Sequence, residues 1–151
     1  MGTKWQNQTQ KELIVFDIKK TTLIAERQGD NISLFCNDHH DKKNILNSFL
    51  VANFCEIREQ KPLRNYLFFN QTKIFVVDSL GIYPNDINPD IIILSKSPKI
   101  NLERMCLKIH PKLIIADASN YKSYINTWKT SCYKDKIPFH ATTEKGFYRI
   151  K

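Results

Sequence analysis

The first quarter of the chain alternates apolar runs with short polar breaks. The apolar runs cover residues 13–16, 21–26 and 32–36. Runs of this length that are rich in β-branched and aromatic residues are typical of strands. Gly29 lies in the break before the third run, where a turn can require a positive φ. The pattern predicts an antiparallel meander of three strands.

The apolar period then changes from strand to helix and back. Between residues 42 and 54 the apolar positions recur at helical spacing, which predicts an amphipathic helix. Residues 56–64 are charged and contain a proline, so we expect a surface connection. Residues 65–69 and 72–78 are apolar runs around Asn70-Gln71, and they predict a β-hairpin.

Two apolar runs in the second half predict a parallel βαβ unit. Residues 90–94 and 112–117 are nearly continuous in β-branched residues, as expected for strands buried on both faces. The segment between them is amphipathic and stops before Pro111, so it predicts a crossover helix. Ligands of such sheets bind beyond the carboxyl ends of the strands. Any site is therefore expected at residues 95–99 and 117–121.

The last part of the chain predicts a further helix and two short strands. An apolar stripe from Tyr121 to Cys132 indicates a helix that ends near Lys134. Residues 137–140 are predicted to form a strand, 143–146 a turn, and 147–150 its hairpin partner. The order of elements predicts an α/β fold with mixed sheets.

Composition and charge limit the class of protein. The 151 residues contain no apolar run of the roughly 20 residues that a membrane span needs. We expect residues 1–12 to be a disordered or linker segment, residues 13–151 to be one domain, and the chain to be soluble. The net charge of +8 favours a polyanionic partner such as DNA, or a charge spread over the surface for solubility.

Two candidate centres can be set aside on spacing. His39, His40 and Asp41 are metal-ligand types, but adjacent residues of an extended loop point in different directions. The four cysteines are far apart and form no CxxC pair, which disfavours zinc or redox chemistry. Cys106 and Cys132 fall on apolar helix faces and are expected to pack there as free thiols. We expect no metal and no cofactor.

The loop after the first parallel strand has three interpretations. Ser95-Lys96-Ser97 could form a nucleophilic Ser–Lys pair, but the loop is too polar to depress the lysine pKa strongly. Pro98 is expected to begin a helix, whose N-terminus, with Lys96 and Lys99, would favour an anion such as phosphate. A helix cap with no ligand is the remaining interpretation.

The loop after the second parallel strand is also polar. Ser119 or Asn120 is expected to cap the helix that starts near Tyr121. Asp78 and Asp117 both end strands and could hold a cation, although no further ligands are evident. The aromatic residues are mostly at core spacing, so a base-stacking platform is not expected.

From residue 74 onward the chain carries a series of motifs in a fixed order: a strand ending in Asp78, a strand entering Ser95-Lys96-Ser97-Pro98, Pro111-Lys112 before a strand, Ser119-Asn120-Tyr121, and the turn 143–146. This series resembles the C-terminal domain of the ComEC competence family of DNA-uptake channel proteins, in particular its Bacteroidetes branch. The resemblance implies a metallo-β-lactamase-like αββα half-sandwich. The family's His-x-His-x-Asp-His segment has no counterpart, and its His-His-Gly-Ser and Asn-x-Tyr-Gly-His motifs lack their histidines here.

The resemblance and these departures together imply a function. A dinuclear hydrolase needs several histidine and carboxylate ligands to activate water, and only Asp78 keeps a ligand-type side chain. We therefore expect a non-catalytic, degenerate domain of a ComEC-like protein in DNA uptake, beside the membrane channel portion of a parent in the bacterial inner membrane. It would bind DNA weakly through its basic loop. A divergent metal-dependent nuclease or phosphodiesterase, and a pure protein-interaction domain, stay open.

Overall fold

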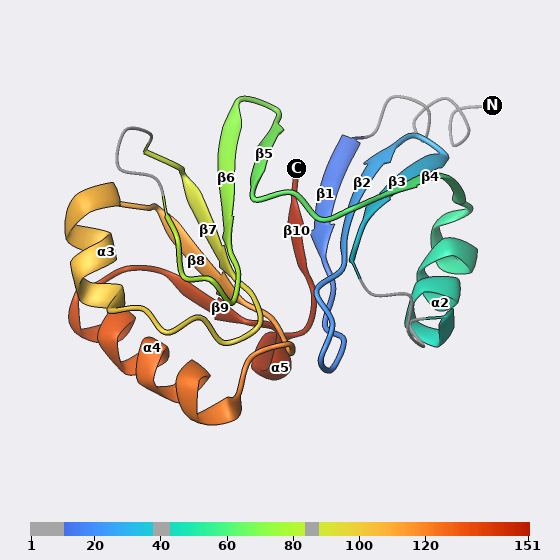
Figure 1. The fold of residues 1–151 in the computed structure, drawn as a ribbon. Helices are drawn as coiled ribbons and strands as arrows, with labels where there is room; N and C mark the ends of the chain where they lie inside the picture. Colours follow the sequence, from blue (N-terminus) through green and yellow to red (C-terminus); the bar gives the residue numbers. More distant parts are fainter. Residues whose placement is uncertain (1–10, 38–42, 84–87) are drawn as a thin grey trace.

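Two five-stranded sheets lie face to face, and helices cover their outer faces (Figure 1). This structure, a computed structural model, describes residues 11–37, 43–83 and 88–151. Each sheet has both parallel and antiparallel neighbours, so the predicted α/β class with mixed sheets is confirmed. The layers run helix, sheet, sheet, helix. Within the ranges described, no helix has the length and apolar character of a membrane span.

The first sheet has the order β10-β1-β2-β3-β4. Strands β1 (Lys11–Val15), β2 (Ile24–Gln28) and β3 (Asn31–Phe35) form the predicted antiparallel meander. Strand β1 begins inside the segment predicted as linker, and β2 begins three residues later than predicted. Gly29 has a φ of 63° in the turn before β3. Helix α2 (Lys43–Asn53) follows, as the helical spacing predicts.

The prediction of a surface connection at residues 56–64 is wrong. Residues Glu56–Lys61 form strand β4, which pairs in parallel with β3 at the edge of the sheet. The side chains of its first five residues are exposed, so the strand shows no apolar alternation. A polar, charged edge strand of this kind also discourages pairing with another chain.

The second sheet has the order β5-β6-β7-β8-β9. Strands β5 (Tyr66–Phe69) and β6 (Thr72–Val77) form the predicted hairpin. Its two turn residues both have positive φ, as a type I′ turn requires. Strands β7 (Ile91–Leu94) and β8 (Leu113–Ala116) are parallel and joined by helix α3 (Leu102–Ile109), which confirms the βαβ unit. Helix α4 (Lys122–Lys134) then leads to β9 (Phe139–Ala141).

The final strand corrects the predicted hairpin. Strand β10 (Tyr148–Ile150) does not pair with β9 but runs antiparallel to β1, in the other sheet. The predicted turn at 143–146 is largely a short helix, α5 (Thr142–Lys145), which carries the chain from one sheet to the other. The Thr142 hydroxyl donates to Asp17 Oδ1 over 3.1 Å, joining this crossing to the loop after β1. Pairing between strands so far apart in sequence leaves no local signal.

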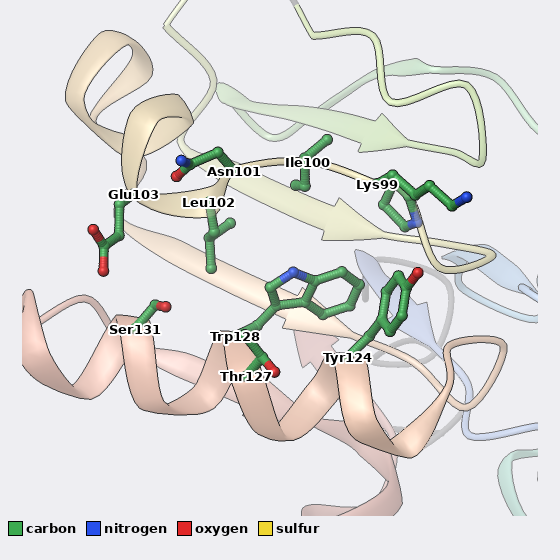
Figure 2. A pocket seen from close by; sticks show the side chains of 10 residues that line it. Lys99, Ile100, Asn101, Leu102, Glu103, Tyr124, Thr127, Trp128 and Ser131 are labelled. Carbon is green, nitrogen blue, oxygen red and sulfur yellow. The ribbon is translucent and has the colours of Figure 1, made fainter.

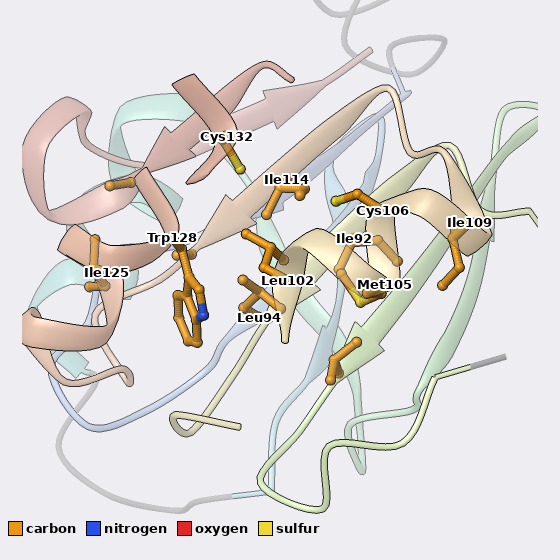
Figure 3. Packing of buried hydrophobic residues seen from close by; sticks show 13 residues of the cluster. Ile92, Leu94, Leu102, Met105, Cys106, Ile109, Ile114, Ile125, Trp128 and Cys132 are labelled. Carbon is orange, nitrogen blue, oxygen red and sulfur yellow. The ribbon is translucent and has the colours of Figure 1, made fainter. Parts of the chain in front are cut away.

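Three apolar layers hold the sandwich together. The inner faces of the two sheets share one cluster, which includes Val15, Ile24, Ile74 and Ile93. Helix α2 covers the outer face of the first sheet. Helices α3 and α4 cover the outer face of the second, as Figure 3 shows around Met105 and Trp128. Burying each large aliphatic side chain stabilises the fold by about 1.5–3 kcal/mol.

The helix thiols are packed as predicted. Cys106 and Cys132 are buried in the cluster under α3 and α4, and none of the four cysteines forms a disulfide. Burial raises the pKa of Cys106 to about 11 and that of Cys132 to about 12. Both thiols therefore stay protonated at neutral pH and act as small apolar groups.

A buried ion pair lies on the outer face of the first sheet. Glu12 on β1 and Arg27 on β2 are register partners, and Arg27 Nη1 lies 3.0 Å from Glu12 Oε1. The Glu12 side chain has no exposed surface, and that of Arg27 is 3% exposed. Arg27 also donates to the Gly29 carbonyl and to Asn53 on α2. Glu12 Oε2 has no hydrogen bond among the described residues, but Arg149 Nε lies 3.7 Å away.

Candidate functional site

Three loops meet where the two sheets come together, and we call them the seam: residues 17–22, 95–99 and 117–121. The last two follow β7 and β8, at the carboxyl ends where a ligand was expected. The first comes from the other sheet. Lys20 N donates to the Ala118 carbonyl, and Lys96 Nζ donates to the Lys20 carbonyl over 2.5 Å. One backbone bond and one side-chain bond therefore join the two sheets at this point.

A chain of hydroxyls crosses the seam. Thr22 Oγ1 lies 2.6 Å from Ser95 Oγ and donates to Ser119 Oγ over 3.0 Å. Ser119 Oγ in turn donates to Asp117 Oδ1 over 2.5 Å. Thr22 and Ser95 are buried. Ser95 and Ser119 are therefore brought together as predicted, through a threonine that sequence reasoning missed.

The Asp117 carboxylate is wholly enclosed at the end of this chain. Its Oδ1 also accepts from Ser119 N and from Asn120 Nδ2. Its Oδ2 has no hydrogen-bond partner in the described part of the chain. Burial raises the pKa of Asp117 to about 6, against a weaker lowering by the hydroxyls of Ser119 and Thr22 and by the charge of Lys96. The desolvation of the carboxylate outweighs its stabilisation by these hydrogen bonds, because a hydroxyl carries no full positive charge.

The two polar loops bond mainly to each other. Lys96 N donates to Ser119 Oγ over 2.9 Å, and Ser97 N donates to Asn120 Oδ1 over 2.8 Å. Asn120 Nδ2 donates to the carbonyl that ends β7, over 2.7 Å. Lys96 and Ser97 both have positive φ, so this exchange holds them in a sparsely populated conformation. Donors that could have faced a ligand are used inside the fold.

The structure corrects the predicted helix starts. Pro98 does not begin a helix: α3 starts at Leu102, and Asn101 is its N-cap through a bond from Arg104 N. The proposed anion site at a Pro98 helix terminus is therefore absent. Neither Ser119 nor Asn120 caps α4, whose N-cap is Tyr121. Ser97 Oγ accepts from Tyr121 N over 2.7 Å instead.

Lys99 and Tyr121 lie apart from the hydroxyl chain. Lys99 lines a groove on the outer face of the second sheet, together with Asn101 and Tyr124. Tyr121 is 69% exposed, and its ring packs against that of Tyr124. Lys96 and Lys99 were expected to form one basic loop, but they lie on two different surfaces.

Asp78 lines a pocket at the edge of the seam, which we call the mouth of the seam. Among the described residues, no hydrogen bond joins Asp78 to Asp117. Asp78 Oδ1 accepts from Leu80 N and Asp78 Oδ2 from Asn65 Nδ2. Asp78, Ser95 and Lys96 line this pocket, which has a volume of about 150 Å³. The other lining residues are Thr22, Asn37, Leu63, Arg64, Asn65 and Ser79. Sequence reasoning missed these six residues. It looked for side chains just after the strands of the second sheet, and only Ser79 lies at such a position.

The donor set does not fit a dinuclear metal centre. Over the described ranges, no three His, Cys, Asp or Glu side chains lie close enough to share an ion. His110 forms the C-cap of α3, and His140 Nε2 bonds to the Gly146 carbonyl. The segment His39-His40-Asp41 lies outside the residues described. Hydroxyls and one enclosed carboxylate are poor ligands for zinc-type ions.

Fold and site together define an αββα sandwich domain whose strand-end site is filled by its own polar side chains. The chain belongs to the ComEC C-terminal domain family, whose model matches residues 13–151. Membership implies involvement in competence and DNA uptake. No curated protein and no solved structure shows significant similarity to the chain. The metallo-β-lactamase-like ancestry of the sandwich stays a prediction.

Proposed function

We propose that this chain is a non-catalytic member of the ComEC C-terminal domain family, which contacts DNA at the mouth of the seam and acts beside the membrane portion of a DNA-uptake protein. The family match supports the setting. The observation that carries the loss of catalysis is the surroundings of Asp117. Its neighbours are hydroxyls and an amide, where a hydrolytic centre needs charged or imidazole ligands.

The pocket at the mouth supports a phosphate contact. Lys96 and Arg64 bring two positive charges to it and Ser79 brings a hydroxyl, whereas the Thr22 and Ser95 hydroxyls bond to each other. Its volume of about 150 Å³ is below the roughly 300 Å³ at which sites for drug-sized ligands begin. A single phosphate of a polymer therefore fits this chemistry better than a free nucleotide. The Asp78 carboxylate opposes an anion, which makes the expected affinity low.

The test is DNA binding measured by fluorescence anisotropy over a range of salt concentrations. Each cationic contact to duplex phosphate contributes about 0.9 to the slope of log K against log salt. The double variant Lys96→Gln/Arg64→Gln should bind more weakly and lose up to about two such contacts. The matched control Lys108→Gln/Lys134→Gln removes the same charge from exposed positions on the two outer helices and should keep the slope.

Three results would overturn the proposal. If the pocket variant and the control lose affinity equally, binding is a property of net charge and not of the seam. If single-stranded and duplex DNA both fail to bind at low salt, an interaction domain without DNA contact is favoured. A metal-dependent nuclease activity that disappears in Asp78→Asn or Asp117→Asn would restore the enzymatic alternative.

A further inference from the structure

A second surface lies on the far side of the second sheet from the seam. A groove of about 620 Å³ runs between helix α4 and the segment that leads into α3. Figure 2 shows Lys99, Ile100 and Leu102 on one wall and Tyr124 and Trp128 on the other. Its volume falls within the range of ordinary ligand sites, about 300–1,000 Å³. Nothing in the proposed DNA contact uses it.

Three aromatic side chains follow one another along the α4 wall. Tyr121, Tyr124 and Trp128 are spaced by three and four residues, so they share one side of the helix. Successive rings meet edge to face, with centroids 5.6 Å and 5.8 Å apart. Exposure falls along the series, from 69% at Tyr121 to 4% at Trp128. Of the three, Tyr124 and Trp128 line the groove, which therefore deepens from a half-buried tyrosine to an enclosed indole.

The Trp128 indole N–H is unpartnered. Among the residues described, no acceptor bonds to it; the ring itself packs in the apolar cluster under α3 and α4 and meets Tyr124 edge to face. Figure 2 shows the indole nitrogen on the edge of the ring that faces the segment carrying Ile100, across the groove. Buried indole N–H groups usually have an acceptor. The deepest part of the groove thus presents one donor that an occupant would satisfy.

The rim of the groove carries opposite charges at its two ends. Lys99 lies near Tyr124, and Glu103 lies at the other end near Ser131 (Figure 2); both side chains are exposed. The Glu103 carboxylate on the rim repels a polyanion. A nucleic acid is therefore disfavoured. An occupant needs carbonyl acceptors, an apolar body and opposite charges at its two ends.

We propose that this groove docks an extended, proline-containing peptide segment of a protein partner. A polyproline II chain makes no internal hydrogen bonds, so its carbonyls are free to accept from an indole N–H. Aromatic-lined grooves recognise such chains because the bound conformation is already formed. The rim places an acidic residue of the peptide beside Lys99 and a basic residue beside Glu103. This inference is independent of the proposed contact with DNA.

The test follows the Trp128 indole signal in ¹H–¹⁵N spectra of the full chain. Two probe peptides carry a Pro-Pro-Leu-Pro core, one with arginine before and aspartate after it, the other with the charges exchanged. One of them should shift the indole signal saturably at concentrations up to about 1 mM. The variant Trp5→Phe identifies which of the two indole signals belongs to Trp128. An alanine version of each core should produce no saturable shift.

Variants separate docking from stability. Trp128→Phe keeps an aromatic ring and loses the donor, and it should weaken binding about 3- to 10-fold. Exposed rim variants avoid any folding defect: Lys99→Glu/Glu103→Lys should reverse the preference between the two peptides. Absence of a saturable indole shift with both peptides overturns the proposal. So does a larger shift with a single-stranded oligothymidine, which would assign the groove to nucleic acid.

Discussion

Two carboxylates in the described part of this domain have no exposed surface, and the chain accommodates them in opposite ways. Glu12 lies within 3.0 Å of the Arg27 guanidinium, which is itself held by Gly29 and Asn53. Asp117 lies among the hydroxyls of Thr22 and Ser119, with one oxygen unpartnered. Glu12 is therefore stabilised by an ion pair, whereas Asp117 is stabilised mainly by hydrogen bonds from neutral groups.

The difference shows which buried acid the fold needs as an anion. Glu12 is matched by a full positive charge, so removing that charge would leave an isolated ion in an apolar layer. Asp117 is matched by hydrogen bonds and only weakly by the charge of Lys96, and burial raises its pKa to about 6. The fold therefore uses the Glu12 pair as a structural contact. It holds Asp117, at the strand-end position, as a carboxyl whose pKa is raised toward neutrality.

The largest expected effect comes from breaking the ion pair. Arg27→Met leaves Glu12 buried without its main partner and should lower the free energy of unfolding by about 3–5 kcal/mol. Urea denaturation at neutral pH measures it. Arg149→Met is the control: that guanidinium is 3.7 Å away and 35% exposed, so its loss should matter less. Replacing both Glu12 and Arg27 by apolar residues should recover most of the loss, and a failure to recover would contradict the assignment.

The next effect is a pH dependence confined to Asp117. Its pKa is about 6 in the folded state, above the ordinary 3.8, so the folded state holds the proton more tightly than the unfolded state. This stabilisation is complete below about pH 4 and is lost as pH rises through about 6, a change of roughly 3 kcal/mol. Asp117→Asn should remove that decline.

The measurement is the difference in unfolding free energy between Asp117→Asn and the parent chain from about pH 4 to about pH 7. The variant should gain on the parent as pH rises. The difference cancels the titration of every other group that the two proteins share. A constant difference over this range would mean that Asp117 is already ionised at low pH, contrary to the comparison with Glu12.

A smaller effect is expected from the hydroxyl that joins the sheets. Thr22→Val keeps the shape of the side chain and removes its bonds to Ser95 and Ser119, so it should cost about 1–2 kcal/mol. It should also raise the pKa of Asp117 further, because the Thr22 hydroxyl lowers it. A ¹³C titration of the carboxyl group reports that pKa. Thr21→Val is the matched control, since Thr21 is buried with no side-chain hydrogen bond among the described residues. If both variants change the stability and the pKa of Asp117 equally, the chain of hydroxyls has no special role.

The smallest effect concerns an ion pair in solvent. Lys129 Nζ lies 2.8 Å from Glu144 Oε2, closer than Arg27 is to Glu12, but both side chains are largely exposed. Lys129→Ala should leave the denaturation midpoint unchanged within error, because solvent screens exposed pairs. A loss as large as that of Thr22→Val would show that distance, and not burial, ranks the charged contacts of this domain.

Local patterns predicted most of the sheet-forming elements. Strands β6, β7 and β8 and helix α4 were evident because their apolar periods match their burial. Strand β4 was missed because its exposed side chains show no period, and the partner of β10 was missed because it lies at the other end of the chain. Strand pairing depends on contacts that no window of sequence contains.

The candidate site was predictable only where it follows the strand-end rule. That rule placed Ser95, Asp117 and Asn120 at one edge of the sheet, and in the structure Asn120 bonds to Asp117 and to the Leu94 carbonyl just before Ser95. The rule could not supply Thr22, which comes from the other sheet. Lys99 was assigned to the site because a helix was expected at Pro98, and the later start of α3 places it on another face.

The pairing of β10 with β1 bears on how the domain is made. During synthesis the first strand leaves the ribosome long before residues 148–150, and until they arrive the first sheet has an open edge at β1. Contacts of such long sequence range slow folding, because the whole intervening chain must be enclosed first. The first sheet of the nascent domain therefore stays incomplete until β10 has been synthesised and can pair with β1.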